Sequence, residues 1–218
     1  MNFNTVTRKP AALFAGTALA ALALTACGSN DSTVSAAGGS TTSSTTAAPS
    51  VSYGPPAAGP PNAQDVTFVK DMLPHHSQAV EMADMALGRD TTPEVKTLAQ
   101  QIKGAQAPEI SAMSGWLTGW GEQIPAGEEM AGHSMGGMSG GTGMLSADEM
   151  TALDKATGTE FARMWLTDMT QHHTGAIQMA QAQTTSGQST DAKQLATNII
   201  SSQTAEIATM KKLLADLA

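Results

Sequence analysis

The chain has 218 residues, with 11 basic and 19 acidic side chains and a formal net charge of −8. This acidic balance disfavours nucleic acid as a partner and favours cations. Cys27 is the single cysteine of the sequence, which excludes an internal disulfide framework and a metal site built from several thiolates.

Residues 1–26 have the pattern of a secretory signal. Arg8 and Lys9 precede an apolar segment that is too short to span a membrane. The segment ends in "LTAC" at residues 24–27, which resembles the lipobox of bacterial lipoproteins, where cleavage precedes the cysteine and lipid is attached to it. We therefore expect export, with the mature chain held by lipid at Cys27 on the outer side of the cell membrane. The alternative is an unprocessed N-terminal anchor with an incidental cysteine.

Composition divides the rest of the chain. Residues 27–62 are rich in Ser, Thr, Gly, Ala and Pro and contain few large apolar side chains, which is typical of a flexible tether. Residues 63–218 are enough for one sizeable core. Within this domain, residues 121–145 form a connection rich in Gly and Met.

The domain contains an internal repeat with a constant offset of 97 residues. "DMLPHHSQAVEMA" at residues 71–83 is followed by "DMTQHHTGAIQMA" at residues 168–180, and further matches run from Lys96 to Leu117 and from Lys193 to Leu214. A register kept without a gap over this length indicates a duplicated supersecondary unit.

Each repeat is expected to be a pair of helices. The first helix runs from about residue 65 to Gly88, and the second begins at Thr92-Pro93. A capping box at Ser146 opens a longer helix that reaches about residue 184, and a last helix covers residues 190–217. With no strand-like alternation, this pattern predicts an all-α, antiparallel four-helix bundle built from two duplicated hairpins.

Helical geometry directs the paired histidines toward the core. His75 and His76 lie about 60° and about 40° to either side of the direction of Met72, so the pair straddles the apolar face of its helix. Asp71 and Met72 lie one turn before the pair. The second repeat places Asp168, Met169, His172 and His173 in the same way.

The second helix of each hairpin carries a carboxylate on its apolar stripe. Glu109 falls within about 20° of Leu98, and Glu206 has the equivalent place in the last helix. A buried carboxylate is costly unless it is paired or bound to a cation. One explanation is a metal-free pairing of each glutamate with a histidine across the bundle, but four imidazoles and several carboxylates exceed what helix register requires.

A metal site therefore becomes the favoured interpretation. Imidazole and carboxylate suit borderline divalent metals, and thioethers add a preference for reduced copper, so copper is favoured over iron, zinc or manganese. The candidate ligands or their orienting partners are His75, His76, His172, His173, Glu109, Glu206, Asp71, Asp168, Met72 and Met169.

The connection between the repeats supplies a second set of candidate donors. Methionines on the helices are explained by core packing, but those of the connection lie among glycines with no core to fill. Capture of a soft metal and a plain connector remain equal alternatives for this segment. Its candidate donors are Met130, His133, Met135, Met138 and Met144.

Both histidine blocks resemble the repeated motif Met-x-x-His-His-x-x-Ala-x-x-Met-Ala of the family catalogued as domain of unknown function 305. The resemblance covers about residues 63–218, although Gln171 stands where the first block has the more usual Pro74. It implies a ferritin-like fold, frequent export and, for some bacterial members, copper binding and copper tolerance. The ferritin di-iron pattern Glu-x-x-His is absent from the sequence, which counts against di-iron oxidase chemistry.

Three functions fit these observations. The favoured one is a non-catalytic, copper-binding lipoprotein that sequesters or transfers the ion outside the cytoplasm. A binuclear-metal oxidase or peroxide-consuming enzyme would use the same cavity, and a metal-free envelope interaction module would use the histidines and glutamates for packing alone. The protein partner is not indicated.

Overall fold

The computed structural model describes residues 60–125 and 143–217. In these two ranges the chain forms helices and no strand, so the predicted all-α class is confirmed. The helices are α1 (Ala63–Leu87), α2 (Pro93–Trp120), α4 (Ala147–Lys155), α5 (Gly158–Ser186) and α6 (Thr190–Asp216). None of these helices is long and apolar enough to cross a membrane. The predicted signal, Cys27 and the tether up to residue 59 lie outside the described residues.

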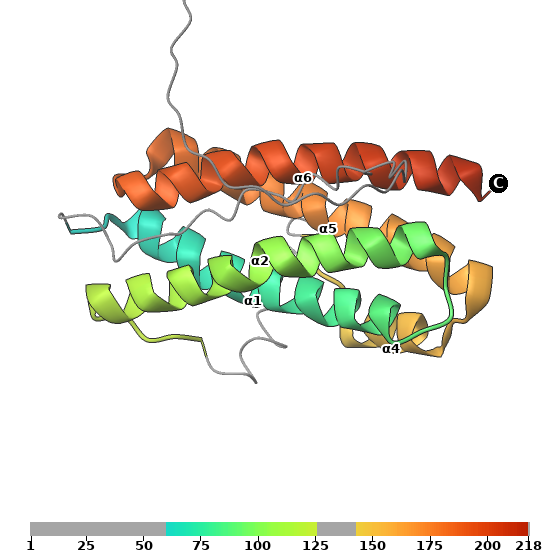
Figure 1. Cartoon of the computed structure of the whole chain (residues 1–218). Coiled ribbons are helices and arrows are strands. Elements are labelled where there is room, and N and C mark those ends of the chain that lie inside the picture. The colour runs from blue at the N-terminus through green and yellow to red at the C-terminus, as the bar shows by residue number, and fades with distance from the viewer. Residues whose placement is uncertain (1–59, 126–142, 218) are drawn as a thin grey trace, which may run out of the picture. The chain divides into compact units, whose positions relative to one another are not determined.

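Two helical hairpins make up most of this part of the chain, α1 with α2 and α5 with α6 (Figure 1). In the first hairpin, Lys70 contacts Glu122 while Lys103 contacts Asp84, so residue numbers fall along α2 as they rise along α1. In the second, Arg163 of α5 reaches the carbonyl of Leu217 at the end of α6. The two helices of each hairpin therefore run antiparallel, as the repeat predicts.

The hairpins meet through α1 and α5, which also run antiparallel. Near one end, the Asn62 side-chain amide donates to the carbonyl of Ser186 over 2.9 Å. Near the other, the indole Nε1 of Trp165 donates to the carbonyl of Met82 over 2.8 Å. These two contacts fix the register in which α5 lies along α1.

One expected helix is divided in the structure. The long helix predicted from Ser146 is broken after Lys155, because Ala156 and Thr157 are extended and Gly158 has a φ of 57°, in the left-handed region. Glycine tolerates that conformation at no steric cost. The break lets α4 turn back so that Leu153 is fully buried against the core, next to Phe161 of α5.

The predicted helix starts and stops are otherwise confirmed. Gly88 caps α1, the Thr92 hydroxyl accepts from the N–H of Val95 over 3.3 Å, and Ser146 forms the expected capping box with Glu149. The capping box between Asn62 and Asp65 was not predicted. Such caps satisfy N–H groups that have no partner within the helix.

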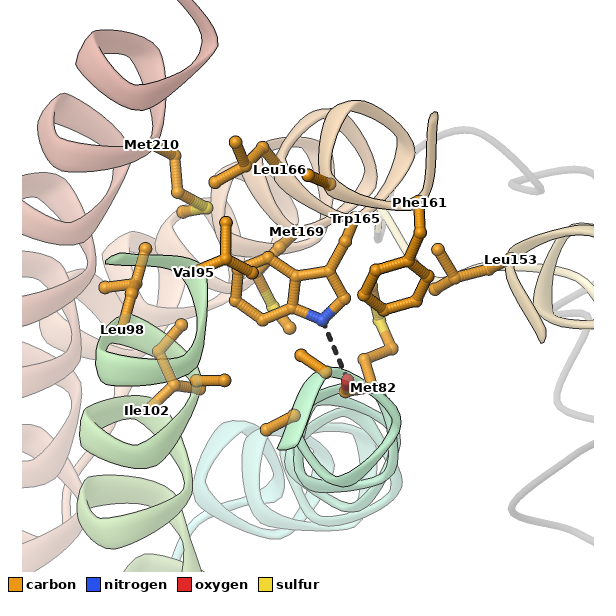
Figure 2. Close-up of a cluster of buried hydrophobic side chains, with 14 of the residues drawn as sticks. Met82, Val95, Leu98, Ile102, Leu153, Phe161, Trp165, Leu166, Met169 and Met210 are labelled. Carbon is orange, nitrogen blue, oxygen red and sulfur yellow. Dashed lines mark hydrogen bonds between the residues drawn. The ribbon is translucent and has the colours of Figure 1, made fainter. Parts of the chain in front are cut away.

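Two apolar clusters fill the interior, one on each side of the histidines. The Trp165 cluster contains Ala79–Ala86 of α1, the first turns of α2 and α5, and Met210 of α6 (Figure 2). The Trp116 cluster contains Phe68–Leu73 of α1, with the last turns of α2 and the first turns of α6. In α1 and α5 the paired histidines separate the two clusters, so a polar layer crosses the middle of an apolar core.

Candidate metal centre

The four paired histidines meet in the middle of the helices, as the repeat predicts. All four are buried, with at most 1% of any of them exposed. His75 of α1 and His172 of α5 lie in contact, with ring centroids 3.7 Å apart and planes inclined by 40°. His173 lies further from His172, at 6.3 Å between centroids. The structure thus brings together imidazoles from two segments that are almost a hundred residues apart.

Each glutamate pairs with a histidine of its own hairpin. Nε2 of His76 lies 2.7 Å from Oε2 of Glu109, and Nε2 of His173 lies 2.7 Å from Oε2 of Glu206. A carboxylate only accepts, so it places the ring proton on Nε2, and a neutral imidazole then keeps a lone pair on Nδ1. These two histidine–glutamate pairs are of the kind expected for a metal-free core. Each pair joins the two helices of one hairpin, whereas the expected pairing ran across the bundle.

Glu109 and Glu206 are both less buried than their histidine partners, and Glu109 is the more buried of the two. The Glu109 side chain is 12% exposed and the Glu206 side chain 17%, whereas their histidine partners are fully buried. Each carboxylate therefore lies at the edge of the polar layer and reaches inward to its histidine.

Several ring nitrogens of the layer have no hydrogen-bond partner among the described residues. These are both nitrogens of His172 and the Nδ1 atoms of His76 and His173. Burial lowers the pKa of His172 well below its ordinary value of 6.5, and the neighbouring rings of His75, His173 and His76 lower that pKa further. His172 is therefore a neutral, fully buried imidazole, and an unsatisfied polar atom at such a position is costly.

The other helical candidates have different surroundings. Met72 and Met169 are fully buried one turn before His76 and His173, each in a different apolar cluster. Asp168 is half-buried, and burial raises its pKa, with a further rise from the negative charge of Glu149 in α4. Asp71 is half-buried on α1. The charge that acts on Asp168 is thus a like charge on another helix.

In the described ranges, no three or more His, Cys, Asp or Glu side chains are arranged so that they could hold a metal ion. The closely packed rings of His75 and His172 leave no space for an ion between them. Binding would therefore require rotation of the rings. Of the candidate donors in the connection, Met144 is described and half-buried, while Met130, His133, Met135 and Met138 lie outside the described residues.

Sequence reasoning missed four polar or glycine positions around the layer. Gln106 and Gln203, one turn before the two glutamates, are buried with side-chain atoms that lack a partner among the described residues. Gln78 and Gly143 anchor the end of the connection beside His172. The repeat pairs the two glutamines with each other, but a glutamine on an amphipathic helix gives no signal of burial. Gly143 is one of many glycines in its segment.

Comparison with known proteins identifies the family of the chain. The family model described as "Domain of unknown function (DUF305)" matches residues 65–214. A structure of a DUF305 fragment from Deinococcus radiodurans is 30% identical, with 72% of this chain and 99% of that chain covered and a TM-score of 0.63. A DUF305 protein from Streptomyces coelicolor, described as secreted, is 34% identical, with 71% and 93% covered and a TM-score of 0.63. No curated protein matches the chain.

A third relative is CopM, whose solved structures include forms with Cu(I), Cu(II) and silver. The Cu(II)-bound form is 32% identical to this chain, covers 71% of it and 97% of its own length, and has a TM-score of 0.59. The family model, these relatives and the twice-repeated His-His block of α1 and α5 lead to one conclusion: the chain belongs to the DUF305 family.

Proposed function

We propose that this protein is an exported, copper-binding lipoprotein with a ferritin-like four-helix bundle, which sequesters the ion or passes it on. The ion is bound by the histidine layer at the contact of α1 and α5. The relation to CopM supports the choice of metal, because that protein was crystallised with Cu(I), Cu(II) and silver. Export and attachment at Cys27 are part of the proposal and are supported by the sequence of residues 1–27.

The observation that carries the proposal is the set of buried ring nitrogens without partners. If the layer served packing alone, two histidine–glutamate pairs would set the register, and apolar side chains would suit the positions of His75 and His172 better. Instead, neither ring nitrogen of His172 makes a hydrogen bond of ordinary geometry with a described residue, although the backbone of His75 is near enough to act against the lowering of its pKa. A metal ion supplies the missing partner for such lone pairs.

The glutamates act in this account as orienting groups. A metal-binding histidine usually donates its other ring N–H to a carboxylate, which fixes the tautomer and makes the ligand nitrogen more basic. Glu109 and Glu206 are in position to do so through Nε2, which leaves Nδ1 of His76 and His173 for the ion. Met72 and Met169, one turn away, are candidate thioether donors that would favour Cu(I) over Cu(II).

Isothermal titration of the full chain with Cu(I) and Cu(II), compared with a variant in which His75, His76, His172 and His173 are all alanine, tests this function. We expect tight binding that the variant loses. Circular dichroism of the variant verifies that its helices are retained. Equal affinity of the folded variant and the wild type would contradict the proposal, because the ion would then bind elsewhere.

A metal-free packing role is the second candidate, and the twin histidine–glutamate pairs favour it. The two functions differ in their response to metal, since a ligand that binds only the folded state raises the melting temperature. The copper proposal predicts a rise in melting temperature with Cu(I) that the four-alanine variant does not show. The packing role predicts no rise in either protein.

A further inference from the structure

The end of the connection between the repeats is in contact with both α1 and α5, next to the paired histidines. Gln78 of α1 makes two hydrogen bonds with the backbone of Leu145: its Nε2 donates to the carbonyl over 2.9 Å, and its Oε1 accepts from the N–H over 2.8 Å. Gln78 lies one turn after His75, on the same side of α1. Residues 143–145, here called the strap, are thereby tied to α1 at the level of the histidines.

The other end of the strap lies directly on α5. Gly143 has a φ of 70°, and a Cβ at this position would lie 2.3 Å from the carbonyl oxygen of Gln171 and 3.1 Å from the Cα of His172. Any side chain would force the backbone away from α5, so this approach requires glycine. Gly143 lies against the backbone of α5 at Gln171 and His172, while Leu145 is held by Gln78 of α1, so the strap joins α5 to α1 at the level of the histidines.

The strap and the histidines near it differ in exposure. The three residues of the strap are half-buried, whereas His75 and His172 are at most 1% exposed. Glu109 of α2 and Glu206 of α6, which pair with the other two histidines, are partly exposed.

We propose that the strap is the cover of the metal site, and that Gly143 and Gln78 are positioning residues that set how fast copper enters and leaves between α1 and α5. The inference rests on the proposed copper binding and adds the route by which the ion reaches it. Only one such fastening exists in the described repeats, because the counterpart of Gln78 at the offset of 97 is Gly175, which has no side chain to hold a second strap.

Chemical access to the histidines tests the cover without any metal. The metal-free full chain is treated with diethyl pyrocarbonate, and modification of each histidine is followed by mass spectrometry. We expect Gln78→Ala to increase the rate at His75 and His172 by about tenfold, the factor expected for the loss of two neutral hydrogen bonds. Gly143→Ala, whose Cβ would push the strap away from α5, should increase the rate at the same two histidines. Equal increases at all four histidines would indicate general loosening and would overturn the proposal, as would unchanged rates.

Exchange of copper tests the route itself. The full chain loaded with Cu(I) is mixed with excess bicinchoninate, and formation of the coloured complex gives the release rate. Competition at equilibrium gives the affinity. We expect both strap variants to release Cu(I) about tenfold faster with an affinity within about twofold of the wild type, because a cover changes entry and exit alike. An affinity that falls by the same factor as release rises would mean distorted ligands and would contradict the proposal.

Matched variants separate the strap from general effects. Gly121→Ala places alanine at another positive φ, 75°, where a Cβ meets nothing within 4 Å. Gln100→Ala removes an exposed glutamine of α2. Both controls should exchange copper and react with diethyl pyrocarbonate as the wild type does. If the wild type binds no Cu(I), the proposed function fails, while site-selective modification in the strap variants would still establish the cover.

Discussion

At the middle of each hairpin a histidine and a glutamate pair over the same distance, 2.7 Å for His76 with Glu109 and 2.7 Å for His173 with Glu206. At the ends of the hairpins this likeness is lost. Asp65 begins α1 with a network of hydrogen bonds, and its counterpart at the offset of 97 is Ala162. Trp165 of α5 donates to the first hairpin, and its counterpart is Phe68, which has no polar atom in its side chain.

The unlike ends join the two hairpins to each other. The carboxylate of Asp65 accepts from the Gln183 side chain over 2.6 Å and from the backbone N–H of Ser189 over 3.0 Å, so α1 is fastened to the turn between α5 and α6. Trp165 fastens α5 to α1 at the other end. The same helices therefore have two roles. The middle of each hairpin, which is repeated, carries the candidate site, and the ends, which are not repeated, hold the two hairpins in register.

Trp165→Ala should have the largest effect on stability. The side chain is fully buried in the Trp165 cluster, and its loss leaves a cavity and removes the hydrogen bond to Met82 (Figure 2). We expect a loss of about 4 kcal/mol in the free energy of unfolding, measured with urea. Trp120→Ala, at the half-buried end of α2, is the control and should cost less than half as much. Equal losses would mean that the end contact has no special role.

Asp65→Asn should cost about 2 kcal/mol at neutral pH, since hydrogen bonds to a charged group are among the stronger ones. Burial acts to raise the pKa of Asp65, but the hydrogen bonds from Gln183 and from backbone N–H groups outweigh it and hold the pKa below 3.8. The contribution is therefore present above that ordinary value and is lost as pH falls through the lowered pKa.

The difference in unfolding free energy between wild type and Asp65→Asn should consequently shrink when urea titrations are repeated at decreasing pH below 3.8. Asp90→Asn, at an exposed position after α1, is the control and should show little difference at any pH. A difference that stays constant to the lowest pH would show that the charge of Asp65 is not what stabilises the junction.

Glu109→Gln and Glu206→Gln should have similar, smaller effects. Glutamine keeps an acceptor for the histidine Nε2–H but loses the charge, so we expect about 1 kcal/mol for each variant in urea unfolding. The two values should agree within about 0.5 kcal/mol, the margin within which independent sites behave alike. Effects that differ by several times this margin would show that the histidine–glutamate pairs of the two hairpins are not equivalent.

Pro108→Ala should have an effect as small as those of the glutamate variants and of the opposite sign. Pro108 is exposed inside α2, where it cannot donate the helical hydrogen bond, and its counterpart in α6 is Ala205. Alanine should raise the free energy of unfolding by about 1 kcal/mol. A loss of stability in the same urea measurement would mean that the proline shapes α2 around Glu109.

The sequence predicted the repeated middle better than the rest. A constant offset together with helical periodicity is enough to direct the histidines of α1 and α5 and the glutamates of α2 and α6 inward, because these follow from local geometry. The same reasoning joined α4 and α5 into one helix. The break depends on the left-handed Gly158 and on the burial of Leu153 against Phe161, a tertiary contact that periodicity does not report.

The hydrogen-bond partner of each polar side chain could not be predicted from the sequence either. The pairing of each glutamate depends on how the two helices of its hairpin pack together. The contact of His75 with His172 and the position of the strap at Gly143 depend on how α1 lies against α5. Asn62, Asp65 and Trp165 fix that register, and the last two belong to no repeated motif. The sequence signal for Asp65 and Trp165 is that they differ from their counterparts at the offset of 97, which are Ala162 and Phe68.

The most direct test of the central claim is anomalous diffraction at the copper edge from crystals of the Cu(I)-loaded full chain. The account predicts a copper peak in the histidine layer at the contact of α1 and α5, with ring nitrogens at ordinary coordination distances of about 2 Å. A copper peak bound only outside the layer, with His75 and His172 still in ring contact, would contradict it.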